Sequence, residues 1–226
     1  MGTGYGHEAE LCDDAPVKQP FGHQPQKKTL SANEQDPLAR LLWLTKILKC
    51  DPKRLVFIDE SGFNLAMTSP YARAPKGQRA YGQVPKNRGE NSNLIAALSL
   101  DEGVLAAMTV EGVVDGIAFN VYVKDVLVPK LRPGQMVVLD NLQVHKHQAV
   151  RQAIEAHGCE LLFLPPYSPD FNPIEHAFSK LKALVRKYNA RTKQTLDDAL
   201  AAALKTVTLQ DVIGWFSHAG YLPHGF

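Results

Sequence analysis

The sequence lacks any segment that could cross a membrane as a helix. None of its 226 residues lies in an apolar run that approaches the roughly 18 residues such a helix needs. The chain begins MGTGYGH, which has no apolar core and so does not predict a secretory signal peptide. These absences predict a cytoplasmic protein without a membrane partner.

Cysteine is also scarce. Cys12, Cys50 and Cys159 are far apart and form no C-x-x-C pair. An odd and scattered set argues against a disulfide framework and against a zinc site. We therefore interpret the three as structural thiols in a reducing compartment.

An excess of one charge is missing as well. Twenty-five Lys and Arg residues against 23 Asp and Glu leave a net charge of +2, so any nucleic-acid signal must come from local clusters. The content of 45% apolar and 21% charged residues is that of an ordinary globular protein. The length allows one sizeable domain with an appendage, or two small domains.

Short apolar runs bounded by turn residues predict strands, and longer stretches with helical periodicity predict helices. The predicted strands cover 54–59, 93–100, 104–110, 136–140 and 160–164, and a further short edge strand is expected within 76–86. The predicted helices cover 36–48, 116–131, 144–157, 196–207 and 209–217, with a long helix that begins at Asn172. This order implies an α/β protein with a mixed five-stranded sheet that helices cover on both faces.

The ends of the helices and the composition of the N-terminus add further expectations. Residues 1–35 are rich in Gly, Pro, Gln, Asp and Lys without periodicity, which predicts a flexible arm. Asn172 is a favoured helix cap and Pro173 a favoured first helical residue. The apolar stripe predicted for the helix over 36–48 is Leu38, Leu41, Leu42, Leu44, Ile47 and Leu48. The inward set predicted for the helix over 116–131 is Ile117, Val121, Val123, Val126, Leu127 and Leu131.

Three acidic residues stand where predicted elements end or begin. Asp59 and Asp140 each close an apolar run without another charge, and Glu175 lies about three residues into the last long helix. A carboxylate at the carboxyl end of a buried strand lies at the sheet edge where open α/β folds bind ligands. Since strand side chains alternate, a site-facing Asp59 leaves Glu60 facing elsewhere.

Together these carboxylates predict a metal site, although each alone has a simpler explanation. A single Asp after a strand is usually a turn former or cap, and a Glu in the first turn of a helix is a favourable charge. Three clustered carboxylates repel one another and favour a hard divalent cation. We expect His145 and His176, which flank the acids, to be hydrogen-bonding neighbours, because hard cations prefer oxygen ligands.

Basic residues accompany the predicted metal site. Lys182 and Arg186 share one helix flank with Glu175, and no acid occurs from 176 to 193. A second basic cluster lies within 73–88. Either cluster is equally typical of a solvated face, but beside a metal site such residues neutralise phosphates. We hypothesise that the residues contacting DNA are Lys182, Arg186, Lys180 and Arg79.

Three motifs carry a resemblance to a known family. Residues 59–64 read DESGFN, residues 138–141 read VLDN with His145-Lys146 after them, and residues 164–175 read LPPYSPDFNPIE. This set closely resembles the IS630/Tc1/mariner transposase superfamily, over roughly residues 27–212. Between Asp140 and Glu175 lie 34 residues, which matches the DD34E spacing of that group.

The resemblance implies a fold and an activity. The fold would be RNase H-like, with Asp59, Asp140 and Glu175 binding two divalent ions, Mg²⁺ or Mn²⁺. These would activate water and then a 3′-hydroxyl, to cut and rejoin DNA at inverted repeats with insertion at TA dinucleotides. Relatives act as homodimers because two DNA ends must be paired.

One departure from the family bears on the domain organisation. Full-length relatives carry an N-terminal helix-turn-helix region, whereas nothing before Leu38 is predicted to be helical. We therefore expect 1–50 to be an arm with a short helix, and 51–226 to be the catalytic domain. The chain would be the second frame of a split gene, served by a separate helix-turn-helix chain, or a remnant. Alternatives are a non-catalytic DNA-binding or interaction protein and a general RNase H-like nuclease.

Overall fold

The structure is a computed structural model that describes residues 33–69, 71–141 and 148–222. These residues lie in one compact unit, Ala32–Phe226. The predicted arm over 1–35 lies almost entirely outside them, and its flexibility stays a prediction. No helix in this part of the chain is long and apolar enough to cross a bilayer. The cytoplasmic location also stays a prediction.

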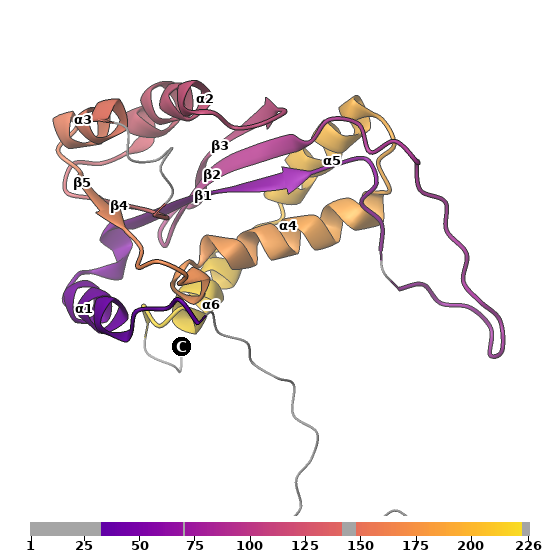
Figure 1. Ribbon diagram of the computed structural model, residues 1–226, viewed down its shortest axis with the longest axis horizontal. Coiled ribbons are helices and arrows are strands. Elements are labelled where there is room, and N and C mark those ends of the chain that lie inside the picture. The colour runs from indigo at the N-terminus through magenta and orange to yellow at the C-terminus, as the bar shows by residue number, and fades with distance from the viewer. Residues whose placement is uncertain (1–32, 70, 142–147, 223–226) are drawn as a thin grey trace, which may run out of the picture. The chain divides into compact units, whose positions relative to one another are not determined.

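A mixed five-stranded sheet forms the centre of this unit (Figure 1). Its strands are β1 (Leu55–Phe63), β2 (Ser92–Ser99), β3 (Gly103–Glu111), β4 (Met136–Leu139) and β5 (Glu160–Phe163). They lie in the order β3-β2-β1-β4-β5, with β1, β2 and β3 antiparallel and β1, β4 and β5 parallel. The α/β class, the strand count and the hairpin predicted around residues 101–103 are confirmed.

Helices cover both faces of the sheet, as the alternation of elements predicted. The helices are α1 (Pro37–Ile47), α2 (Gly116–Val121), α3 (Gln148–Ala156), α4 (Ile174–Tyr188), α5 (Lys193–Leu204) and α6 (Leu209–His218). α2 and α3 pack on one face of the sheet, and α4, α5 and α6 pack on the other face (Figure 1). α1 adds Trp43 and Ile47 to the core under α4, so it belongs to the same unit as the predicted catalytic domain.

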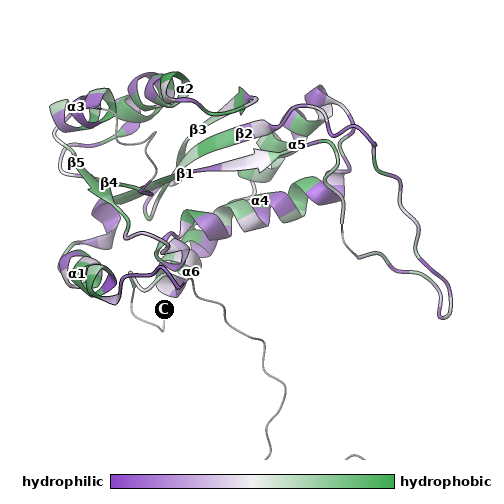
Figure 2. Cartoon of the chain, viewed as in Figure 1, coloured by the Kyte–Doolittle hydropathy of each residue, from purple (hydrophilic) through white to green (hydrophobic). Residues whose placement is uncertain are grey.

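Side chains along β1 alternate between the two cores that this layering creates. Leu55 and Phe57 lie in the core shared with α4, whereas Val56 and Ile58 lie in the core shared with α2 and α3. Figure 2 shows the matching pattern in the helices, since α4 has a hydrophobic side toward the sheet and hydrophilic residues on its other side. The alternation of side chains along a strand therefore decides in which of the two cores each β1 residue lies.

β1 continues four residues beyond the strand end predicted at Asp59. Gly62 and Phe63 still pair with Asn93 and Ser92 of β2. The prediction was wrong because Ser and Gly are turn formers by local preference, and pairing with a neighbouring strand overrides that preference. Asp59 thus lies within a strand and not at its end.

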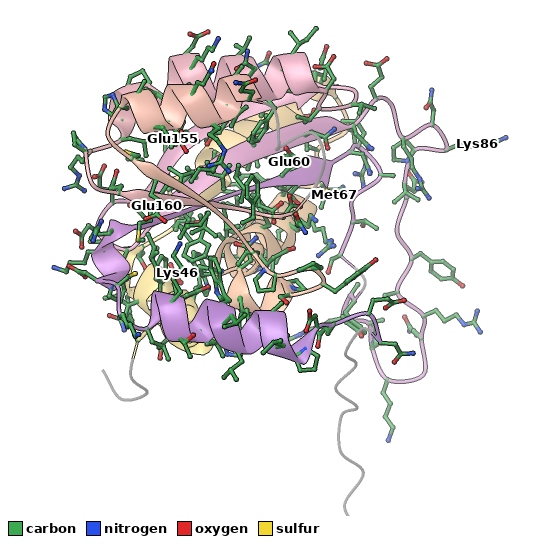
Figure 3. All side chains as sticks on the ribbon, turned by 60° about the vertical axis from the view of Figure 1, so that its left-hand side comes forward. Lys46, Glu60, Met67, Lys86, Glu155 and Glu160 are labelled. Carbon is green, nitrogen blue, oxygen red and sulfur yellow. The ribbon has the colours of Figure 1, made fainter. Side chains whose placement is uncertain are left out.

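The edge strand predicted within 76–86 does not form. Residues 64–69 and 71–91 contain no strand, and they leave the sheet as a long loop between β1 and β2 (Figure 1). Pro75, Pro85 and the left-handed Gly77 interrupt this segment, and proline cannot donate to a strand ladder. Lys86 projects from the loop into solvent (Figure 3).

Two predicted apolar stripes are partly wrong. In α1, Trp43 and Ile47 are buried, whereas the exposed fractions of four predicted stripe members, Leu38, Leu41, Leu42 and Leu48, are 57–65%. α1 lies at the border of the core, so only a narrow side of it packs against other residues.

The helix predicted over 116–131 forms as three pieces: α2, a π-helical stretch (Tyr122–Leu127) and a 3₁₀ turn (Val128–Lys130). Its first turns expose Ile117 and Val121 and bury Phe119. The π-helical stretch that follows has a different period, so a single apolar stripe does not run through the whole segment.

Candidate active site

The pairing of β1 with β4 brings two of the predicted acids side by side. Leu55 lies opposite Met136 and Phe57 lies opposite Val138. Continuing this register by two residues places Asp59 beside Asp140. Phe57 and Val138 both face the core under α4, so the alternation of strand side chains turns both carboxylates toward α4.

The third acid comes from α4 itself and completes one cavity. Glu175 lies in the first turn of α4. A cavity of about 450 Å³ is lined by Asp59, Asp140 and Glu175, together with Asn141, Asn172 and residues 164–169. Glu60 lines a different cavity with Glu90 and Asn91. The structure therefore brings the three predicted acids together and turns Glu60 away from them, as we predicted from the alternation along the strand.

The acids share this cavity without forming a closed cage. Among the residues that the structure describes, no three His, Cys, Asp or Glu side chains are close enough together to hold a metal ion. The three acids nevertheless line one cavity. Three carboxylates are the donor set that hard divalent cations prefer.

Asp59 shows the electrostatic consequence of this arrangement. Burial raises the pKa of Asp59 to about 7, and repulsion from Glu175, Asp140 and Glu60 adds to the rise. The backbone N–H of Glu60, which donates to Oδ1 of Asp59 at 2.7 Å, opposes it. A divalent cation in the cavity would neutralise the charge that burial and repulsion make costly.

Asn172 has a role that the sequence did not predict. α4 begins at Ile174 without a side-chain cap, so the predicted Asn172 cap is wrong. The Asn172 side chain donates from Nδ2 to Oδ2 of Asp59 at 3.0 Å instead. Its Oδ1 is buried and has no hydrogen-bond partner among the described residues. A buried, unpaired acceptor beside three acids suits a cation or the water that a cation carries.

The predicted DNA-contacting residues fall into different environments. Lys182 and Arg186 are half-buried on α4 and form no ion pair with another described residue. Lys180 donates from Nζ to Oδ2 of Asp211 at 2.5 Å and to a backbone oxygen of the turn before α6. Arg79 is exposed on the loop between β1 and β2. Lys180 thus has a structural contact, and we leave it out of the proposed DNA-contacting set.

Of the two histidines predicted near the acids, His176 differs from the expectation. The ring of His176 packs edge-on against His218, with ring centroids 4.6 Å apart, and no hydrogen bond of its side chain is seen among the described residues. Burial and the neighbouring His218 lower the pKa of His176. His145 lies outside the described residues.

Comparison with known families identifies the kind of site. The sequence model of the DDE superfamily endonucleases matches residues 54–197, which span all three acids. This chain belongs to that superfamily. Transposable element Tcb2 transposase of Caenorhabditis briggsae is 26% identical over 191 residues, covering 79% of this chain and 70% of that protein. The predicted resemblance of this DDE endonuclease domain to IS630/Tc1/mariner transposases is confirmed.

Solved structures agree on the fold. The Mos1 transposase paired-end complex with left transposon end matches with a TM-score of 0.71 at 16% identity, covering 87% of this chain. The catalytic domain of Mos1 mariner transposase matches with a TM-score of 0.58 at 16% identity, covering 81% of this chain and 86% of that one. The RNase H-like fold is thereby confirmed. The match spans 63% of the Mos1 chain in that paired-end complex.

Proposed function

We propose that this chain is the catalytic part of a DNA transposase that cuts and rejoins DNA strands with two divalent metal ions. Asp59, Asp140 and Glu175 would hold the ions. The observation that carries the proposal is the gathering of these three acids in one cavity of a DDE endonuclease domain. The similarity to transposases, among them Tcb2, favours transposition over other reactions of this superfamily.

Mg²⁺ or Mn²⁺ fits the residues of this cavity. The donors are oxygens, burial and the neighbouring carboxylates raise the pKa of Asp59, and Oδ1 of Asn172 is unpaired among the described residues. Mos1 mariner paired-end complexes have been solved with Mn and with Mg. When bound, two such ions would activate the attacking oxygen and stabilise the leaving one.

Each residue of the cavity would contribute through its position. The backbone N–H of Glu60 and the amide of Asn172 each take one oxygen of Asp59, which orients that carboxylate toward the cavity. Asp140 follows directly on β4, and the rigid sheet fixes where it lies beside Asp59. Glu175 lies at the amino terminus of α4, where a negative charge is favoured. No Ser, Cys or His nucleophile is required.

We also propose the partners that such a reaction needs. These are the inverted repeats at transposon ends, a TA target, a second copy of this chain and a separate helix-turn-helix chain. Lys182 and Arg186 support the DNA partner, because they continue the α4 flank that begins at Glu175. A phosphodiester held at the acids would extend along this flank toward the two cations.

Reversing both charges tests this contact. We expect Lys182→Glu with Arg186→Glu to weaken DNA binding about tenfold or more at ~0.1 M salt, since each lost phosphate contact also lowers counterion release. Fluorescence anisotropy with a labelled duplex measures it. The matched control is Lys124→Glu with Lys130→Glu, two exposed cations on the opposite side of the sheet. Equal affinity of the two double variants would contradict the contact.

An assay of cutting and joining separates the proposal from its alternatives. Supercoiled plasmid with Mg²⁺ or Mn²⁺ reports nicking, and a labelled oligonucleotide with a free 3′-hydroxyl reports joining. The proposal expects both reactions. Nicking without joining would indicate a general RNase H-like nuclease, and DNA binding without either reaction would indicate a non-catalytic remnant.

A further inference from the structure

The segment between β5 and α4 carries much of the cavity wall, and α1 holds it from outside. Arg40 of α1 donates from both terminal nitrogens to Asp170, at 2.9 Å to Oδ1 and 2.6 Å to Oδ2. Its guanidinium carbon also lies 4.0 Å from the ring centroid of Phe171. One side chain of α1 therefore contacts two successive residues of this segment. Bidentate pairs of this kind fix orientation as well as distance.

Two further hydrogen bonds fix the same segment. Gln35, just before α1, donates from Nε2 to the backbone oxygen of Tyr167 at 2.7 Å. Tyr221, near the end of the described chain, donates its hydroxyl to the backbone oxygen of Phe171 at 2.6 Å. Tyr167 adopts a left-handed conformation with φ of 54°, which is uncommon for a residue other than glycine. Such a backbone needs contacts from its surroundings to hold its shape.

Asp170 and Phe171 are followed in the chain by residues of the site. Residues 169–171 form a single 3₁₀ turn, which ends next to Asn172. Asn172 then donates to Asp59, and Glu175 follows three residues later. A shift of Asp170 would therefore move the donor of Asp59 and the start of α4 together. Neither Arg40 nor Asp170 belongs to the described lining of the cavity.

We infer that Arg40 and Asp170 are positioning residues, which hold the turn before α4 so that Asn172 and Glu175 meet Asp59 in the cavity. This inference rests on the proposed function, because it assigns the pair a part in assembling the metal site. The guanidinium lowers the pKa of the Asp170 carboxyl, which favours the ionised form of the pair. The pair thus connects α1 to the turn before α4, although Arg40 and Asp170 are 130 positions apart in the chain.

α1 offers a matched control for this inference. Lys46 of the same helix donates to Glu160 at the start of β5, through one contact of 2.9 Å between side chains that are 51% and 49% exposed. Figure 3 labels both residues. An exposed single-contact pair of this kind contributes little. The Asp170 side chain is 52% exposed, but the Arg40 side chain is 21% exposed, makes two hydrogen bonds to Asp170 and is stacked on a ring. Loss of the two pairs should therefore have different consequences.

The test compares Arg40→Ala, Asp170→Ala, their double variant, Arg40→Lys and Lys46→Ala in the full chain. Hydrogen exchange followed by mass spectrometry reads protection of the amides around residues 166–176. Mn²⁺ titration reads assembly of the metal site, and plasmid nicking at saturating DNA reads catalysis. Melting temperature shows whether each variant is folded.

We expect Arg40→Ala and Asp170→Ala each to lose exchange protection at 166–176 and to lower the nicking rate about 10- to 100-fold, as misplacement of a catalytic group by about 1 Å does. Mn²⁺ affinity should fall with the rate. The double variant should resemble Arg40→Ala, because Asp170 acts on the turn through Arg40. Arg40→Lys should keep only part of the exchange protection and nicking rate, since lysine lacks the bidentate geometry. Lys46→Ala should match the unmodified protein.

The two ideas fail in different ways. If Arg40→Ala keeps its exchange protection, Mn²⁺ affinity and nicking rate within twofold of Lys46→Ala, the positioning role is wrong while the transposase proposal stands. If the unmodified protein neither binds Mn²⁺ nor nicks DNA, the proposed function fails, and exchange protection still decides whether Arg40 holds the turn. Additive effects of Arg40→Ala and Asp170→Ala would also overturn the inference, because they would show two independent contacts.

Discussion

Replacing Asp140 by Asn should reduce metal-dependent nicking of supercoiled DNA by about 1,000-fold or more while the protein still folds. Asn keeps the shape of the side chain but removes the charge that would hold a cation beside Asp59. A loss of about 4 kcal/mol in transition-state stabilisation corresponds to this factor. Asp140 follows β4 and is only partly buried, so we expect the melting temperature to change little. Initial nicking rates with Mg²⁺, together with circular dichroism, measure both effects.

Glu60 supplies the control for this change. It neighbours Asp59 in β1, but its side chain lines a separate cavity on the other side of the strand. Glu60→Gln removes the same kind of charge at a similar position in the sheet and should leave nicking within a few-fold of the unmodified rate. If Asp140→Asn still cleaved as fast as Glu60→Gln, the assignment of Asp140 would be wrong.

Replacing Asp59 by Asn should stabilise the metal-free protein above pH 7 and at the same time abolish nicking. The pKa of Asp59 is about 7 in the folded chain, against an ordinary value of 3.8. Between these values the folded state binds a proton that the unfolded state has lost, so stability falls as pH rises through this window. The cost is fully present above pH 7. After allowance for solvent screening it should amount to about 1–3 kcal/mol.

Urea unfolding in EDTA at pH 5 and at pH 8 measures this effect. The free energy of unfolding of the unmodified protein should fall between the two pH values by more than that of Asp59→Asn. Mg²⁺ at pH 8 should recover stability in the unmodified protein only. An identical pH dependence for both proteins would show that Asp59 does not carry the raised pKa.

The parts of the fold that follow from local pattern were open to prediction. Apolar runs ending at Asp59 and Asp140 identified β1 and β4, and the period of two along a strand correctly separated Asp59 from Glu60. The end of β1 was not open to prediction in this way. It depends on pairing with β2, which begins only at Ser92, and the local preference of Ser and Gly for turns points the other way.

The supporting contacts of the site were hidden for a similar reason. The sequence indicated a capping role for Asn172 because Asn is a favoured N-cap residue. In the folded chain the Asn172 side chain donates to Asp59 instead. The two residues are 113 positions apart, so local sequence preference could not reveal this contact. The pair of Arg40 and Asp170 is equally remote in sequence. Within α1, apolar periodicity could not show that Trp43 and Ile47 are buried in the core while Leu38, Leu41 and Leu42 stay exposed.

Calorimetric titration with Mn²⁺ tests the central claim most directly, because it reports the metal site without DNA or a partner chain. The account predicts saturable binding to the unmodified protein, and its loss in each of Asp59→Asn, Asp140→Asn and Glu175→Gln but not in Glu60→Gln. Absence of binding to the unmodified protein, or equal binding by all of these variants, would contradict it.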